Sequence, residues 1–108
     1  MRVLKFGGTS LANPERFSQA AQLIEKAHLE EQAAGVLSAP AKITNHLVAL
    51  SEKAVLNQPT DTHFNEAIEI FYNIINGLHA ENNKFDLAGT KALIDAEFAQ
   101  IKGLLEEI

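Results

Sequence analysis

Residues 2–17 read RVLKFGGTSLANPERF, and this stretch decides the fold. The short apolar run Arg2–Phe6 predicts a β-strand, and the glycine pair that follows ends it. Asn13 before Pro14 is a typical helix start, because asparagine caps the first turn and proline fits the first helical position. The stretch therefore predicts a strand that is followed within a few residues by a helix.

The first helix is expected over about residues 14–31, with charged residues on its solvent side. Its apolar positions, which recur at helical spacing, are Phe17, Ala20, Ala21, Ile24 and Ala27. A second strand is expected over Ala33–Ser38, although Gly35 disfavours it. A strand–helix–strand unit predicts a parallel pair of strands.

Three more helices are expected after a Ser-Ala-Pro-Ala loop: residues 44–56, a helix capped by Asp61 or Thr62, and a helix from about Asp86 onward. Their apolar stripes are Leu47, Leu50 and Ala54, then Phe64, Ala67, Ile68, Phe71, Ile75 and Leu78, then Leu87, Thr90, Ile94, Phe98, Ile101 and Leu105. The predicted fold class is α/β, helix-rich, with the order β-α-β-α-α-α and two short parallel strands.

The pattern indicates part of a larger domain. Two parallel strands are marginal alone, because parallel sheets are usually wider and covered on both faces. The last apolar stripe continues to Ile108 without a C-capping glycine or a following proline. We therefore expect residues 1–108 to be an incomplete N-terminal part of a domain. The alternative is a small complete helical domain with a β decoration.

The composition excludes several classes of protein. The chain has 108 residues, 46% of them apolar, and a net charge of −5, which argues against sequence-independent nucleic-acid binding. It has no cysteine, so it has neither disulfides nor thiolate chemistry. No signal peptide and no apolar run of about 20 residues is present. We expect a cytoplasmic protein with no nucleic-acid or membrane partner.

The segment KFGGTS has the composition of a phosphate-binding loop. Gly7 and Gly8 expose backbone N–H groups and let an anion approach, and a helix N-terminus adds partial positive charge. Lys5 supplies an ammonium group, and Thr9 and Ser10 supply hydroxyl donors. The segment is neither a Walker A loop nor a dinucleotide fingerprint. The alternative is a tight Gly-Gly turn with an exposed lysine.

A second polar loop is expected beside the first. Ligands of open α/β sheets bind at the carboxyl ends of the strands, and both predicted strands end at that edge. The second loop brings Ser38, Lys42, Thr44 and Asn45. Two hydroxyl-rich loops with a lysine between them suit a polar, anionic small molecule, although Lys42 is equally well explained as a solvated lysine.

The four histidines predict no metal site. His28, His46, His63 and His79 share no metal-ligand spacing, and solvent or capping positions explain them better. His46 alone is of interest, because it follows the second loop.

Three segments resemble the aspartokinases, members of the amino-acid kinase superfamily. They are VLKFGGTSLANPERF at 3–17, VLSAPAKITNHLVAL at 36–50 and EFAQIKGLLEEI at 97–108. The second segment is most similar to the threonine-sensitive aspartokinases that also carry a homoserine dehydrogenase. The resemblance covers essentially the whole chain, although residues 57–95 match mainly in helical pattern.

The resemblance implies a three-layer α/β/α kinase domain. Aspartokinases transfer the γ-phosphoryl group of MgATP to the β-carboxylate of L-aspartate, the first step toward lysine, methionine and threonine. By this resemblance Lys5 contacts the transferring phosphate, and Gly7 and Gly8 donate backbone N–H groups to it. Phosphoryl transfer depends on such positioning and charge stabilisation.

The same resemblance assigns the substrate-side residues. Thr9 and Ser10 line the site, and Ser38 and Thr44 help to hold the aspartate. The family's later Arg-Gly-Glu segment and its Gly-Arg-Gly-Gly-Ser-Asp-type loop are absent from these 108 residues, as are the regulatory domains and the NADP-dependent dehydrogenase. We therefore expect the chain alone to be inactive, and to form a homodimer through an exposed sheet edge or a helix.

Two other functions stay open. The first is another amino-acid kinase, such as a glutamate or carbamate kinase. The segment SAPAKITN argues against this alternative. The second is a non-catalytic helical interaction module, in which KFGGTS is only a turn.

Overall fold

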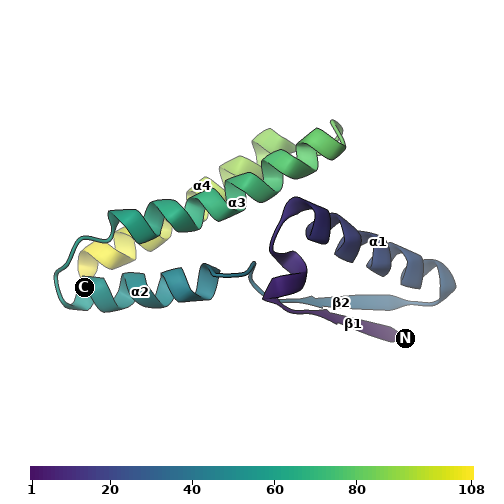
Figure 1. The fold of residues 1–108 in the computed structure, drawn as a ribbon, viewed down its shortest axis with the longest axis horizontal. Helices are drawn as coiled ribbons and strands as arrows, with labels where there is room; N and C mark the ends of the chain where they lie inside the picture. The colour runs from purple at the N-terminus through teal and green to yellow at the C-terminus, as the bar shows by residue number, and fades with distance from the viewer.

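A computed structural model describes residues 1–108 and confirms the predicted order of elements (Figure 1). The elements are β1 (Arg2–Phe6), a short 3-10 helix η1 (Gly8–Leu11), α1 (Pro14–Glu30), β2 (Ala33–Leu37), α2 (Ile43–Val55), α3 (Asp61–Glu81) and α4 (Leu87–Glu107). The fold is an α/β arrangement with two short strands and four α-helices. None of the helices is both long enough and apolar enough to span a membrane.

The two strands are parallel neighbours, as predicted. Arg2 pairs with Ala33 at one end of the register, and Phe6 pairs with Leu37 at the other. Gly35 is accommodated in β2 for a packing reason: a β-carbon there would lie 2.8 Å from Cδ1 of Ile24 on α1. The glycine therefore marks a point where α1 approaches the sheet closely.

The first helix begins and packs largely as its sequence predicts. Asn13 caps it, since its Oδ1 accepts a hydrogen bond from the Arg16 N–H at 2.9 Å. Ala20 and Ala27 are buried, but Ala21 is exposed, contrary to the prediction. Residues 20, 24 and 27 lie above one another on a helix, whereas position 21 is turned to the flank of that stripe.

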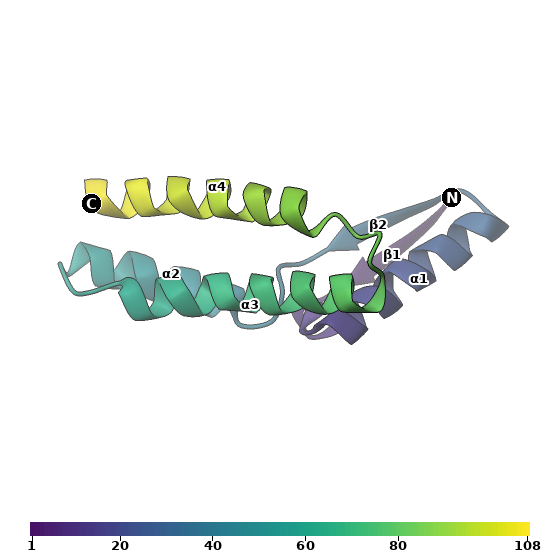
Figure 2. The same cartoon turned by 90° about the horizontal axis from the view of Figure 1, so that it is seen from above.

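Helices α2, α3 and α4 form the second half of the molecule, and Figure 2 shows α3 and α4 side by side. Their core holds Ile43, Ala67 and Phe98. The ring of Phe98 meets Phe64 and Phe71 edge-on, with centroids 5.6 and 5.7 Å away. The predicted stripes of the last two helices therefore contribute to the core, together with Ile43 of α2.

Some predicted boundaries and positions are wrong by small amounts. The second strand ends at Leu37, one residue before Ser38, and α2 begins at Ile43 rather than Thr44. The capping position of α3 is Thr60, which makes no side-chain capping bond, rather than Asp61 or Thr62. Leu47 is 38% exposed, because it lies at the flank of the α2 face that buries Ile43 and Leu50.

The molecule is elongated, measuring 52 × 29 × 19 Å. The β1–α1–β2 unit lies at one end and the three remaining helices at the other (Figure 1). The carboxyl ends of both strands point toward the junction of the two halves, and this junction holds the loops that carry the predicted site.

Candidate functional site

The two predicted loops meet at the ends of the strands. The Ser38 N–H donates to the Phe6 carbonyl at 3.0 Å, which ties the start of the second loop to the end of β1. A β-carbon on Gly8 would lie 3.0 Å from the Ala39 carbonyl oxygen and 3.5 Å from the Cα of Ala41. The expected convergence of the loops is therefore present.

The glycines serve this convergence through their small size. Gly7 is extended, with φ −83° and ψ 177°, and no glycine of the chain has a positive φ. The bend therefore needs no left-handed glycine. Gly8 packs against the second loop, whereas a β-carbon on Gly7 would meet nothing within 4 Å. The side of the loop next to Gly7 is open to a ligand.

A short 3-10 helix changes the predicted role of the following helix. The helix predicted from about residue 14 is expected to add partial positive charge from its N-terminus, a few residues after the glycines, but η1 (Gly8–Leu11) lies between them and α1. The first turn of α1 is already capped by Asn13. The partial positive charge at the N-terminus of α1 therefore does not reach the glycines, contrary to the prediction. The Gly7 N–H donates to no backbone carbonyl. Gly8 is the first residue of η1, so its N–H has no acceptor within that helix.

Lys5 is free to bind an anion. Its side chain is exposed and forms no ion pair. In the register Lys5 pairs with Val36, one position away from Gly35, which faces α1. Because side chains alternate along a strand, Lys5 lies on the sheet face opposite α1.

Thr9 and Ser10 follow the glycines in η1, and both are exposed. The Arg16 guanidinium donates to the Thr9 carbonyl at 2.8 Å, and the Ser10 N–H donates to the Gly7 carbonyl at 3.1 Å. These bonds fix the backbone of the loop and leave both hydroxyl groups available. Ser10 also lines a shallow pocket between β1 and α1, which the other predicted site residues do not line.

Ser38 begins the second loop and Thr44 lies in the first turn of α2, and both residues are at the surface. Pro40 between them is buried, and Lys42 has a left-handed backbone conformation with φ 74°. A lysine rarely adopts this conformation, which here turns the chain into α2. Neither loop contains an aspartate or glutamate, so the site residues supply a cation, amide donors and hydroxyl groups.

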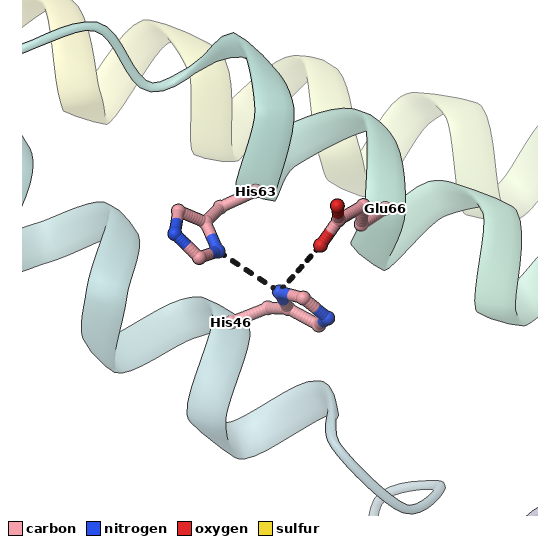
Figure 3. Close-up of side chains that lie close together, drawn as sticks. All are labelled: His46, His63 and Glu66. Atoms are coloured by element: carbon pink, nitrogen blue, oxygen red, sulfur yellow. Dashed lines mark hydrogen bonds and ion pairs between the residues drawn. The ribbon is translucent and has the colours of Figure 1, made fainter.

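The structure corrects the prediction for two histidines. His46 on α2 and His63 on α3 meet, with 3.1 Å between their Nδ1 atoms, although they are 17 residues apart in the chain (Figure 3). Oε2 of Glu66 lies 3.6 Å from the same His46 atom. Spacing along the sequence misses this cluster, because it depends on how α2 packs against α3. His28 is exposed as expected, and the His79 ring nitrogen lies 3.3 Å from the Phe85 carbonyl near the end of α3.

Comparison with known proteins tests the resemblance. The chain is 93% identical, over all of its 108 residues, to a bifunctional aspartokinase/homoserine dehydrogenase of Haemophilus influenzae. It is 39% identical, again over 108 residues, to the protein of the same name in Buchnera aphidicola. The chain is a relative of the aspartokinases. This aspartokinase resemblance extends to plants, since 53 residues are 51% identical to aspartokinase 3, chloroplastic, of Arabidopsis thaliana.

The match to the two bacterial proteins covers all of the chain and the match to the plant protein 49% of it, but the chain covers little of any of them. The chain spans 13% of the length of the two bacterial proteins and 9% of the plant protein. No family model matches the sequence.

Proposed function

We propose that the chain contributes to the catalytic domain of an aspartokinase, which transfers the γ-phosphoryl group of ATP to the β-carboxylate of L-aspartate. The observation that carries this proposal is the meeting of the two loops at Gly8 and Ala39, beside an unpaired lysine. The names of the relatives supply the substrate class. We also propose that the full-length protein carries homoserine dehydrogenase activity, with NADP bound outside these residues.

The proposed roles follow from the donors that are available. Lys5 and the Gly7 and Gly8 N–H groups stabilise the negative charge on the transferring phosphoryl group. A carboxylate oxygen of aspartate forms a bond to the γ-phosphorus while the bond from that phosphorus to the β,γ-bridging oxygen breaks, and ADP leaves with the electron pair. Ser38 and Thr44 hydrogen-bond the aspartate, and Thr9 and Ser10 line the site.

The Mg²⁺ ion that accompanies ATP does not fit these two loops. Mg²⁺ prefers oxygen ligands and is usually held by one or two carboxylates together with phosphate oxygens and water. Residues 5–10 and 38–45 contain no carboxylate. We therefore assign the ion no ligand in this chain, and we expect residues 1–108 alone to show no aspartate-dependent ATP turnover.

Replacing Lys5 in the corresponding full-length enzyme tests the phosphate assignment. Lys5→Ala should lower kcat by about 10²–10³-fold, the usual cost of losing one donor to transition-state charge. The KM for aspartate should change much less. Lys26→Ala is the matched control, because Lys26 is also exposed and unpaired but lies on α1, away from the loops. An unchanged kcat in Lys5→Ala would refute the assignment.

Replacing the hydroxyl residues at the start of the second loop and at the start of α2 tests the substrate side. Ser38→Ala and Thr44→Ala should chiefly raise the KM for aspartate, because they remove contacts that are equal in the ground and transition states. Ser51→Ala is the control, since Ser51 lies farther along α2 and bonds only to the Val48 carbonyl. A rise in the KM for ATP instead would place the second loop on the nucleotide side.

A further inference from the structure

We propose that His46, His63 and Glu66 form a binding site for one zinc ion between α2 and α3. The site is separate from the proposed phosphate site, and the proposal does not depend on the kinase assignment. Nothing in the names of the relatives points to it. The argument starts from the positions of three donor atoms (Figure 3).

Two of the three donor–donor distances are close to the spacing that zinc requires. Zinc binds nitrogen and oxygen at about 2.0–2.2 Å with tetrahedral angles, so two of its ligand atoms lie about 3.3–3.5 Å apart. The two Nδ1 atoms are 3.1 Å apart, and Nδ1 of His46 and Oε2 of Glu66 are 3.6 Å apart. All three donors lie within 4.8 Å of one another. The Glu66 side chain is 55% exposed, so a change in its rotamer can close the remaining distance.

The two helices hold the donors in place from both sides. His63 and Glu66 are three residues apart on α3, a spacing that puts them on one face of a helix. His46 lies in the first turns of α2, where its N–H donates to the Lys42 carbonyl at 3.1 Å. Its side chain is only 15% exposed, which limits competition from water. The two rings are inclined at 53°, so they do not stack, and Figure 3 shows their Nδ1 atoms facing each other.

The close contact of the imidazoles requires either a shared proton or a cation between the two Nδ1 atoms. Without an ion, one Nδ1 must carry a proton and donate it to the other, since two bare lone pairs would repel. A zinc ion accepts both lone pairs at once, and each ring then keeps its proton on Nε2. Two neutral imidazoles and one carboxylate give the ligand set a charge of −1 against the +2 of the ion. Zinc binding is therefore expected to change the tautomer of one ring.

The ligand types select zinc over magnesium. Imidazole nitrogen suits zinc and its neighbours in the first transition row, whereas Mg²⁺ takes oxygen ligands. A His₂Glu set leaves the fourth position of zinc to a water molecule. The ion would join α2 to α3 across the turn at residues 56–60, and it would stabilise the folded chain because the unfolded chain lacks the assembled site.

Titration of the 108-residue chain with ZnCl₂ in a calorimeter tests the proposal, with MgCl₂ as the comparison ion. One Zn²⁺ per chain should bind and raise the melting temperature, and EDTA should reverse the shift. His46→Ala, His63→Ala and Glu66→Gln should each weaken binding at least about 10-fold. The matched controls are His28→Ala, exposed on α1, and Glu69→Gln, exposed one turn along α3, which should bind Zn²⁺ like the parent chain.

A second measurement keeps the test independent of how well the variants fold. Long-range ¹H–¹⁵N correlation spectra of the parent chain report which ring nitrogen carries the proton, and on adding Zn²⁺ both His46 and His63 should show protonated Nε2 and metal-bound Nδ1. An absence of Zn²⁺ binding would overturn the proposal. So would Zn²⁺ binding by all three ligand variants as tight as that of the parent chain. Unchanged His46 and His63 tautomers, or a loss of binding in His28→Ala, would also overturn it.

Discussion

Gly8 lies so close to Ala39 that a β-carbon on the glycine would come within 3.0 Å of the alanine carbonyl oxygen. Few β-carbons in proteins have a neighbour this close, and the neighbour here is backbone, which cannot rotate away. The contact joins the two loops that carry Lys5 and Ser38. The relative position of the proposed phosphate and aspartate contacts therefore depends on a residue without a side chain at position 8.

Gly8→Ala should lower the free energy of unfolding by about 1 kcal/mol. Overpacking costs about 1–3 kcal/mol, and the loss of glycine's freedom in the unfolded chain offsets about 0.4–1 kcal/mol of it. Gly7→Ala is the matched control, because a β-carbon there meets nothing within 4 Å and φ is −83°. This control should be neutral or slightly stabilising. Urea unfolding of both variants measures the difference, and equal stabilities would show that the loops do not touch at Gly8.

Asn13→Ala should destabilise the chain by about 1 kcal/mol, since it removes the side-chain acceptor of the Arg16 N–H at the start of α1. Asn13→Ser should keep most of the stability, because serine is an equally good N-cap. Urea unfolding followed by far-UV circular dichroism compares the two variants. If serine proved as costly as alanine, the loss would have to be assigned to something other than capping.

Local signals in the sequence predicted most of the fold. The glycine pair, Asn13 with Pro14, and the Ala-Pro-Ala segment separate the elements, and each acts within a few residues. The strand and helix boundaries are therefore correct to within one residue at most ends. The core around Phe98 was predicted equally well, because a stripe of period 3.6 identifies the buried face of a helix wherever its neighbours lie.

Features that depend on packing could not be predicted in this way. Spacing along one chain says nothing of how α2 lies on α3, so the contact between His46 and His63 was missed. The 3-10 helix after Gly7 and the left-handed Lys42 also have no pattern in the residues around them. The meeting of the two loops was predicted correctly, because parallel strands bring their carboxyl ends to one edge.

The pKa of Tyr72 should lie above its ordinary value of 10.0. Its hydroxyl donates a hydrogen bond to the Asp95 carboxylate, and this bond raises the pKa most, followed by partial burial and the charges of Asp95 and Glu69. Because the folded pKa is raised, the associated stability is present below pH 10 and is lost as the pH rises through the folded pKa. Asp95→Asn should bring the pKa of Tyr72 back toward 10.

Absorbance of tyrosinate against pH measures this value directly, since Tyr72 is the only tyrosine and the chain has no tryptophan. Glu69→Gln is the comparison variant and should lower the pKa of Tyr72 less than Asp95→Asn does. Equal titration curves for the parent chain and Asp95→Asn would contradict the hydrogen bond.

We propose, finally, that the 108-residue chain associates with itself through the sheet. Both strands have an unpaired edge, and the face opposite α1 exposes Val3 at 58% and Val36 at 50%. Open edges and exposed apolar faces favour pairing with a second copy, most simply as a two-fold dimer. Light scattering after gel filtration should therefore give twice the mass of the chain, and Val36→Lys should shift the mass toward that of the monomer.

Val55→Lys is the control, because Val55 is 70% exposed on α2, away from the sheet, and this variant should leave the dimer intact. A monomer that unfolds cooperatively at about 100 µM, a concentration at which exposed apolar surface commonly associates, would refute the dimer.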